Sequence, residues 1–345
     1  MVKSIAMELK LRSTFVDEVI KTIYFGGGTP SLLDTADIEF LLATVFEQYS
    51  VSEEPEITLE ANPEDIDAMK LLRWKEAGIN RLSIGIQTFA DDRLELINRS
   101  HNGRQAMNAL EQVQMAGFRN YSCDLIYAIP PADMAVWKND LEKALSFDPP
   151  HISLYSLTIE PRTVFGSQLK KGQITELSDQ ENAAQYDLAV HILKEAGYHH
   201  YEVSNFCKPG FISRHNSSYW KGSSYIGVGP GAHSYDQQNR LWNVSHNHQY
   251  ISDIGKGNLP QTTEALTSLE RANEYILTRL RTWMGIDLDY LRDELKVDLS
   301  RSHRKEISFL VESKFAEEDG PVLKLTDEGL ARADEITLKF FQDES

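Results

Sequence analysis

The feature that most constrains the fold is a repeated helix ending. Three segments of helical character end in Ala-Gly, at Gly78, Gly117 and Gly197, and a strand-like segment follows each of them within a few residues. Glycine just past a helix accepts the left-handed backbone conformation that ends the helix. Helices and strands that alternate at this spacing predict parallel strands joined by right-handed crossovers. We therefore expect an α/β fold, as a barrel or partial barrel rather than an open sheet.

The expected strands are short, and several of them end in glycine or polar residues. They cover residues 22–25, 56–63, 81–87, 121–130, 151–157 and 201–206. The first stops at Gly26–Gly28, where the missing Cβ atoms let a ligand approach the backbone closely. Ligands of a parallel barrel bind at the carboxyl ends of its strands, where Glu60 and Gln87 fall. Asp124 lies within an apolar strand, and it either serves a ligand or hydrogen-bonds a neighbouring loop.

Composition excludes several classes of protein. The chain has 345 residues and a net charge of −17, which argues against nucleic-acid binding through phosphate neutralisation. No apolar run approaches the ~20 residues that cross a bilayer, and residues 1–20 are too charged for a signal peptide. Two distant cysteines, Cys123 and Cys207, fit a reducing cytosol, so we expect a cytoplasmic protein.

Five segments carry a family resemblance through their order and spacing. They are G-G-G-T-P at 26–30, T-L-E-A-N-P at 58–63, S-I-G-I-Q-T-F at 83–89, I-N-R at 97–99 and D-L-I-Y-A-I-P at 124–130. Together they resemble the radical S-adenosylmethionine (SAM) superfamily, in its oxygen-independent coproporphyrinogen III oxidase-like branch. The resemblance implies a partial (β/α)6, TIM-like barrel lacking its first strand, and a mainly helical, winged-helix-like C-terminal domain. The implied domains are 1–206 for the barrel, 207–262 for a connecting region and 263–345 for the helical domain.

The resemblance also implies a SAM site. Backbone groups of the glycine turn would meet the methionine amino group, and the acidic and amide side chains would hydrogen-bond the ribose. Arg99 would form a charge-assisted fork with the methionine carboxylate, although from its position alone it is an ordinary solvated helix residue. The implied SAM residues are Gly27, Gly28, Thr29, Glu60, Gln87, Arg99 and Asp124.

A later motif, H-N-x-x-Y-W at residues 215–220, resembles the HemW-type heme chaperones of this branch. His215 and Asn216 would then take part in heme recognition, with Tyr219 and Trp220 as an aromatic surface for the porphyrin. The alternative is a capped turn that carries two core aromatics. A nearby stretch, 226–235, imitates a dinucleotide-binding fingerprint, but it lacks the helix and acidic residue that such a site requires, and we interpret it as a loop.

The chain departs from its family in one respect. Radical SAM chemistry needs a [4Fe–4S] cluster held by a C-x3-C-x2-C loop, and Cys123 and Cys207 match no such spacing. We expect the chain to be N-terminally truncated, with the cluster loop before Met1 and residues 1–19 corresponding to the helix that follows the loop. On this interpretation the cluster belongs to the full-length parent, and the chain has no metal ligand and no catalytic side chain of its own.

Three functions remain open, and with them whether the protein is an enzyme. The first is a heme chaperone that binds heme and SAM and delivers heme to acceptor proteins, one of which could bring it to a membrane surface. The second is a coproporphyrinogen III oxidase that oxidatively decarboxylates two propionates. The third is a cluster-free pseudo-enzyme that only binds SAM or porphyrin. The H-N-x-x-Y-W motif favours the first.

Overall fold

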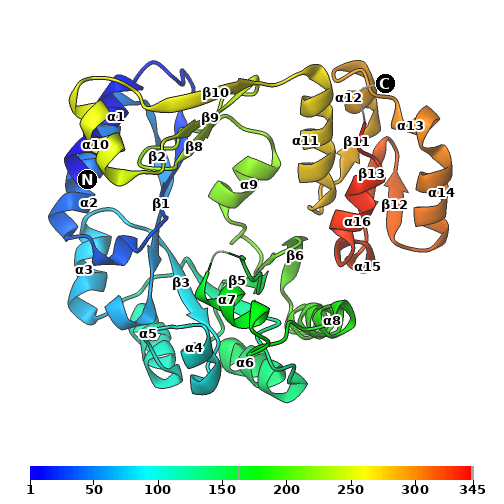
Figure 1. Cartoon of the computed structure of the whole chain (residues 1–345), viewed down its shortest axis with the longest axis horizontal. Helices are drawn as coiled ribbons and strands as arrows, with labels where there is room; N and C mark the ends of the chain where they lie inside the picture. The colour runs from blue at the N-terminus through cyan, green and yellow to red at the C-terminus, as the bar shows by residue number, and fades with distance from the viewer. Residues whose placement is uncertain (162, 343–345) are drawn as a thin grey trace. The chain divides into compact units, whose positions relative to one another are not determined.

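The computed structural model describes residues 1–161 and 163–342 as a mixed α/β protein (Figure 1). Contacts divide the chain into two compact units. Unit 1 comprises Met1–Ile23, Asp34–Glu56 and the chain from Ser213 onward, and unit 2 comprises Tyr24–Leu33 and Ile57–Ile212. None of the helices in the described ranges is both long and apolar enough to cross a membrane. The cytoplasmic location and the domain boundaries after residues 206 and 262 stay predictions.

The main sheet has seven strands in the order β1-β2-β3-β4-β5-β7-β6. Strands β2 to β5 pair in parallel, which confirms the predicted α/β partial barrel. The strands are β1 (Ile20–Phe25), β2 (Val51–Ala61), β3 (Arg81–Gln87), β4 (Tyr121–Tyr127), β5 (His151–Ser156), β6 (His199–Glu202) and β7 (Asn205–Cys207). The helices among them are α2 (Thr35–Gln48), α3 (Ala68–Glu76), α4 (Asp91–Leu96), α5 (Gly103–Met115), α6 (Met134–Ser146), α7 (Val164–Lys170) and α8 (Asp179–Glu195), with short 3-10 turns at Pro30–Leu32 and Pro63–Asp65.

The three predicted helix endings are confirmed. Helices α3, α5 and α8 each stop two residues before the expected glycine. Gly78, Gly117 and Gly197 have φ angles of +104°, +73° and +83°, in the left-handed region that favours glycine. The repeated Ala-Gly pattern therefore marked real boundaries between crossover helices and strands.

One predicted strand was wrong. Residues 201–206 form two short strands, β6 and β7, joined by a tight turn at Val203–Ser204 rather than one parallel strand. Strand β7 runs antiparallel to both β5 and β6. The turn contains no glycine; instead the Glu202 carboxylate accepts hydrogen bonds from the Ser204 N–H and the Asn205 side chain. Such side-chain support is invisible to a pattern of apolar and polar residues.

The two faces of the central strands differ in polarity. Leu82, Ile84 and Ile86 of β3 are fully buried on one face, and α3, α5, α6 and α8 lie along the outer side of these strands (Figure 1). The opposite face of the sheet carries Ser83 and Ser122, which are paired in register. Parallel strands covered on both faces are usually apolar throughout, so this polar inner face is the unusual feature of the sheet.

Unit 1 contains the N-terminal helix, two small antiparallel sheets and most of the C-terminal helices. Its elements from the N-terminus and the middle of the chain are α1 (Val2–Leu11), α9 (Arg214–Trp220), β8 (His233–Tyr235), β9 (Asn239–Asn243), α10 (Asn247–Gly255) and β10 (Gln261–Ala265). The C-terminal elements are α11 (Ser268–Leu280), β11 (Ile286–Asp287), α12 (Leu288–Asp293), α13 (Leu299–Ser302), α14 (Arg304–Glu312), β12 (Ala316–Asp319), β13 (Val322–Leu325), α15 (Asp327–Leu330) and α16 (Ala333–Leu338). Helices around a three-stranded sheet, β11-β13-β12, match the predicted winged-helix-like end.

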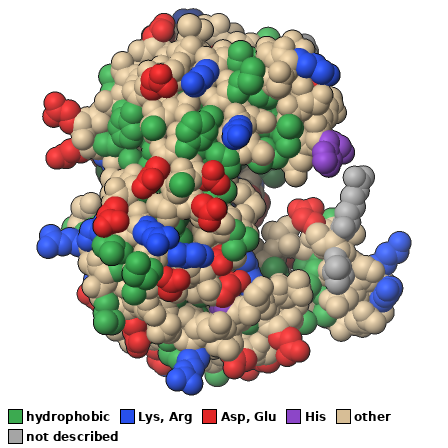
Figure 2. All heavy atoms as spheres, turned by 90° about the vertical axis from the view of Figure 1, so that its left-hand side faces the viewer, with side chains coloured by type: hydrophobic (Ala, Val, Ile, Leu, Met, Phe, Trp, Pro, Cys, Tyr) green, Lys and Arg blue, Asp and Glu red, His purple; other side chains and the backbone are tan. Residues whose placement is uncertain are grey.

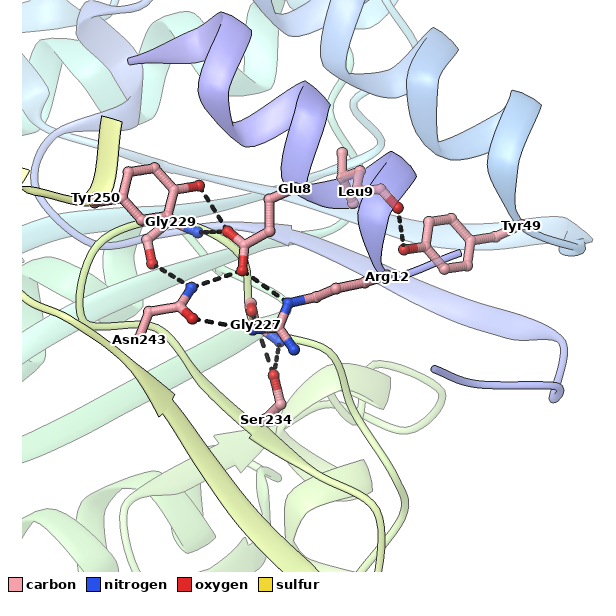
Figure 3. Close-up of polar contacts among 9 residues, drawn as sticks. All are labelled: Glu8, Leu9, Arg12, Tyr49, Gly227, Gly229, Ser234, Asn243 and Tyr250. Carbon is pink, nitrogen blue, oxygen red and sulfur yellow. Dashed lines mark hydrogen bonds and ion pairs between the residues drawn. The ribbon is translucent and has the colours of Figure 1, made fainter. Parts of the chain in front are cut away.

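A buried carboxylate joins α1 to the loop that imitates a dinucleotide fingerprint (Figure 3). Glu8 is fully buried and forms an ion pair with Arg12 one turn later. It also accepts hydrogen bonds from the Gly229 N–H, Asn243 and Tyr250, which lie in the loop, β9 and α10. The loop therefore has a structural anchor in α1, which supports the interpretation that it is not a nucleotide site.

The side of the molecule drawn in Figure 2 mixes hydrophobic, acidic and basic side chains. Helix α2 of unit 1 has two exposed aromatic side chains, because Phe40 and Phe46 are 47% and 50% exposed. The opposite face of α2 is apolar in the usual way, with Ile38, Leu41 and Leu42 buried. The helix is therefore apolar on more of its circumference than a simple amphipathic helix.

Candidate functional site

The glycine turn after β1 is open and left-handed. Gly27 and Gly28 have φ angles of +75° and +69°, and no atom lies within 4 Å of the place where a Cβ would be. Gly26 differs, because a Cβ there would lie 2.5 Å from the Tyr24 ring. Thr29 precedes the 3-10 turn that starts at Pro30. The turn thus exposes backbone groups to a ligand, as the sequence predicted for three successive glycines.

Glu60, near the end of β2, holds this turn in place. Its Oε1 accepts a hydrogen bond from the Tyr24 hydroxyl at 2.8 Å, and its Oε2 accepts one from the Gly27 N–H at 3.1 Å. Burial, and then the nearby Glu60 charge, raise the pKa of Tyr24, so the tyrosine remains a donor. The predicted proximity of Glu60 to the glycines is confirmed, and Tyr24 is a site residue that the sequence analysis missed.

Gln87 ends β3 in a left-handed conformation, with a φ angle of +66°. Its side chain lies over Gly85, since a Cβ on Gly85 would be 2.7 Å from Gln87 Nε2 and 3.7 Å from Asn62 Oδ1. The side chain of Gln87 is therefore accommodated by a glycine two residues earlier in the same strand. Asn62, which follows β2, is a further polar neighbour that the sequence analysis did not single out.

The Asp124 carboxylate is held by two serines. Ser83 of β3 donates to its Oδ2 at 2.6 Å, and Ser122 of β4 donates to its Oδ1 at 2.5 Å. Its partners therefore come from strands, not from the loop that the sequence alternative proposed. Glu60 pairs with Ser83 in the β2–β3 register, so Glu60, Ser83 and Asp124 occupy neighbouring strands on one face of the sheet.

Arg99 follows α4, after Asn98 with a φ angle of +56°. Its guanidinium is half-buried and makes no hydrogen bond or ion pair with residues 1–161 or 163–342. Burial lowers the pKa of Arg99, and the charge of Glu64 opposes that shift. Because a guanidinium stays charged even when it is partly buried, Arg99 offers a free fork of donors for an anionic group.

The residues of the H-N-x-x-Y-W motif lie on α9 in unit 1. His215 Nδ1 is 3.0 Å from the Thr22 hydroxyl, and its Nε2 is 3.1 Å from the Tyr219 hydroxyl. The backbone N–H groups of Arg214 and His215 donate to the buried Glu56 carboxylate at 3.1 and 2.9 Å. Both the ring and the backbone of His215 are therefore held by the protein.

The aromatic residues near His215 form a continuous series of ring contacts. The rings of His215 and Tyr219 meet edge to face at 5.0 Å, and those of Tyr219 and Tyr225 do so at 4.7 Å. Tyr235 adjoins Tyr225 at 6.1 Å. Tyr219 is 40% exposed, so it is not the core aromatic of the sequence alternative. That alternative was right about the cap, because the Ser213 side chain accepts from the Asn216 N–H.

The residues that are present fit SAM but not an iron–sulfur cluster. An open glycine turn, two strand carboxylates on the same face and a free guanidinium provide polar groups for both the amino-acid end and the ribose of SAM. No group of three or more His, Cys, Asp or Glu side chains among the described residues could hold a metal ion. Cys123 and Cys207 are both buried, and burial raises the pKa of Cys123 well above its usual value and that of Cys207 to about 11. Buried thiols that resist ionisation are poor cluster ligands.

Comparison with known proteins identifies the class first. A model of the Radical SAM superfamily matches residues 3–144, and a model of the HemN C-terminal domain matches residues 266–332. The solved structure of coproporphyrinogen III oxidase (HemN) from Escherichia coli, a radical SAM enzyme, is similar with a TM-score of 0.82 over 99% of this chain and 82% of that chain. At 21% sequence identity this likeness shows the fold. The fold is thus that of the radical SAM superfamily, which implies SAM and a [4Fe–4S] cluster as cofactors.

Two relatives then give the family. The chain is 34% identical over 331 residues to the heme chaperone HemW of Lactococcus lactis, covering 96% of this chain and 87% of the relative. It is 34% identical over 319 residues to the heme chaperone HemW of Bacillus subtilis, covering 92% and 84%. The chain belongs to the HemW family.

Proposed function

We propose that this protein is a heme chaperone of the radical SAM type, which binds heme and SAM and delivers heme to acceptor proteins. Relatives named heme chaperone HemW match it over almost its whole length. The structural observation that carries the proposal is the partly exposed aromatic cluster around His215, composed of Tyr219, Tyr225 and Tyr235. Aromatic rings beside a histidine suit a ligand that is a flat, apolar macrocycle with a central iron.

The hydrogen bonds of His215 favour ligation through Nε2. When Nδ1–H donates to the Thr22 hydroxyl, Nε2 carries the lone pair and accepts from the Tyr219 hydroxyl. Because Tyr219 is partly exposed, its hydroxyl can turn to water and free Nε2 for iron. Thr22 would then orient the imidazole, as a hydrogen-bonded outer partner usually does for a metal-binding histidine. Asn216 and Trp220, both partly exposed on the same helix, complete the proposed heme surface.

The SAM part of the proposal concerns unit 2. Gly27, Gly28 and Thr29 would receive the methionine end of SAM, where Arg99 supplies charge for its carboxylate. Glu60, Gln87 and Asp124 would receive the ribose. Bound SAM supplies the 5′-deoxyadenosyl group of radical chemistry, but that chemistry also needs the cluster, which the described residues do not fit. For this chain we therefore propose binding of SAM and derive no radical step.

Coproporphyrinogen III oxidation is the second candidate, and the fold shared with HemN is the observation in its favour. The two functions make opposite predictions about porphyrin substrates. A chaperone retains heme unchanged and passes it on, whereas the oxidase converts coproporphyrinogen III to protoporphyrinogen. A protein that binds SAM or heme but performs neither task would be a pseudo-enzyme.

The test is an anaerobic titration of hemin into the wild-type protein and the His215→Ala and Trp283→Ala variants. Trp283 is an exposed aromatic of unit 1 outside the cluster and serves as the matched control. We expect a Soret shift that saturates at one heme per chain for wild type and Trp283→Ala, and a large loss of affinity for His215→Ala. Heme transfer to apomyoglobin then measures delivery. Unchanged affinity in His215→Ala would exclude this site, and protoporphyrinogen formation from coproporphyrinogen III would exclude the chaperone.

A further inference from the structure

Asp124 is one end of a chain of buried hydrogen bonds that the SAM proposal does not use. Ser122 Oγ lies 2.5 Å from Asp124 Oδ1, 2.8 Å from His151 Nδ1 and 2.9 Å from Ser153 Oγ. His151 Nε2 is in turn 2.7 Å from the Tyr201 hydroxyl. Ser122, His151, Ser153 and Tyr201 are all buried, with at most 3% of their surface exposed. These four residues are therefore shielded from water, whereas Asp124 at the end of the series is partly exposed.

One arrangement of protons accounts for the hydrogen bonds that join Asp124, Ser122, His151 and Tyr201. A serine hydroxyl has one proton and two lone pairs. With Asp124 ionised, Ser122 gives its proton to the carboxylate and accepts from His151 Nδ1–H and the Ser153 hydroxyl. His151 Nε2 then accepts from Tyr201. Burial, with the positive charge of Arg81, lowers the pKa of His151 well below its usual value, so the ring is neutral as this arrangement requires.

The register of the strands sets the positions of the side chains in this series of hydrogen bonds. Ser83 pairs with Ser122 across β3 and β4, and Ser122 pairs with His151 across β4 and β5. Because side chains in a strand alternate, Ser122 and Asp124 point to the same face. The three strands thus bring the two serine donors to opposite oxygens of Asp124. Groups held by strands are placed more rigidly than groups held by loops.

We propose that Ser122 is a positioning residue for Asp124, holding its carboxylate so that the two remaining lone-pair directions meet the 2′ and 3′ hydroxyls of an adenosyl ligand. An ionised carboxylate accepts at about four positions, and Ser83 and Ser122 occupy two of them. The other two match a vicinal diol, which donates two hydrogen bonds. This inference rests on the proposed SAM binding.

Ser122→Ala should weaken the contact of Asp124 with the ribose without changing the rest of the ligand site. The alanine leaves one oxygen of Asp124 without its serine donor and leaves His151 Nδ1–H without its acceptor. We expect the affinity for S-adenosylhomocysteine, which needs no cluster, to fall by about tenfold. The affinity for its 2′,3′-dideoxy analogue, which lacks the diol, should change by about twofold or less. A merely structural defect would lower both affinities equally.

The experiment is calorimetric titration of both ligands into wild type, Ser122→Ala, Ser83→Ala and Cys123→Ala. Ser83→Ala removes the other donor to Asp124 from a half-buried position. It should cause the same selective loss of affinity for S-adenosylhomocysteine, so the inference can still be tested if Ser122→Ala folds poorly. Cys123→Ala is the matched control, since it removes one buried atom from the other face of β4 and should not affect the ratio of the two affinities.

The outcomes separate the two proposals. The inference is supported if wild type binds S-adenosylhomocysteine and the two serine variants lose affinity for it but not for the analogue that lacks the diol. If wild type binds S-adenosylhomocysteine but both serine variants keep the wild-type ratio of the two affinities, the role of Ser122 is overturned. The proposed SAM binding then stands. Wild type that binds neither S-adenosylhomocysteine nor SAM overturns the proposed SAM binding, and the role of Ser122 with it.

Discussion

Replacing Glu8 by alanine should release the loop at residues 226–232 from α1. The Glu8 carboxylate accepts from four donors: Arg12 Nε at 2.8 Å, the Gly229 N–H at 2.8 Å, Asn243 Nδ2 at 2.7 Å and the Tyr250 hydroxyl at 2.6 Å. Figure 3 shows these donors converging on the carboxylate from the helix, the loop, β9 and α10. Alanine removes the carboxylate that accepts from all four donors.

The free-energy cost of Glu8→Ala follows from the burial of the Glu8–Arg12 ion pair. Glu8 and Arg12 are 0% and 2% exposed, so the substitution leaves a buried guanidinium that already has one unpaired nitrogen, Nη1. Removing one partner of a buried ion pair costs about 3–5 kcal/mol. At about 1.4 kcal/mol per factor of ten, hydrogen exchange of the loop amides should accelerate by roughly a hundredfold to a few thousandfold. Hydrogen exchange is the appropriate assay, since a chain of two units need not unfold in a single transition.

Two further variants test the reasoning. Lys10→Ala removes an exposed pair with Glu47 from the same helix, at 4.0 Å, and should change exchange by about threefold or less. Glu8→Ala combined with Arg12→Met should recover only part of the protection, because it removes the unpaired guanidinium but leaves Gly229, Asn243 and Tyr250 without their shared acceptor. If Glu8→Ala accelerated exchange no more than Lys10→Ala does, the buried carboxylate would not be what holds the loop.

Three other predictions concern unit 2. Gly26→Ala should place a Cβ 2.5 Å from the Tyr24 ring and displace the glycine turn, so SAM affinity should fall at least about tenfold; equal affinity by calorimetry would contradict this. Gly85→Ala meets the mobile end of Gln87 at 2.7 Å, so we expect a smaller loss, of about threefold, with an unchanged melting temperature. Burial raises the pKa of Cys207 in the folded state from 9.0 to about 11. The folded state therefore favours the protonated thiol, and this contribution to stability is fully present below pH 9 and is lost as the pH rises through about 11. Because two pKa units correspond to about 3 kcal/mol, the stability of wild type relative to Cys207→Ala should fall between pH 9 and 11, and a constant difference in denaturation would refute the assigned shift.

The fold was predictable because its signals are local. Gly78, Gly117 and Gly197 predicted three helix ends. Each end depends only on the left-handed backbone of one glycine, and the structure contains all three. The β6–β7 hairpin was not predictable in the same way. Its turn depends on the Glu202 carboxylate, which caps residues two and three positions later. A search for glycine turns does not detect this kind of support.

The candidate site was predictable only in part. The family motifs supplied Glu60, Gln87 and Asp124, and the structure places them on neighbouring strands. Tyr24 and Ser122 were missed because they look like ordinary strand residues, and their function depends on register. A pattern with period two could have shown that Ser122 and Asp124 share a face, but it could not have shown which residue of β3 pairs with Ser122.

The inner face of the sheet shows how the protein itself satisfies partly buried carboxylates. Glu60 is satisfied by Tyr24 and Gly27, and Asp124 by two serines. Each carboxylate thus has protein donors that offset the cost of its partial burial. Since these donors come from strands and a tight turn, the carboxylates are oriented before any ligand arrives, and binding needs little reorganisation. Arg99 differs, because no partner among the described residues satisfies its donors. Binding of an anion would therefore reduce the free-energy cost of partly burying the Arg99 guanidinium. The two carboxylates gain less from a ligand, because they already have donors in the protein.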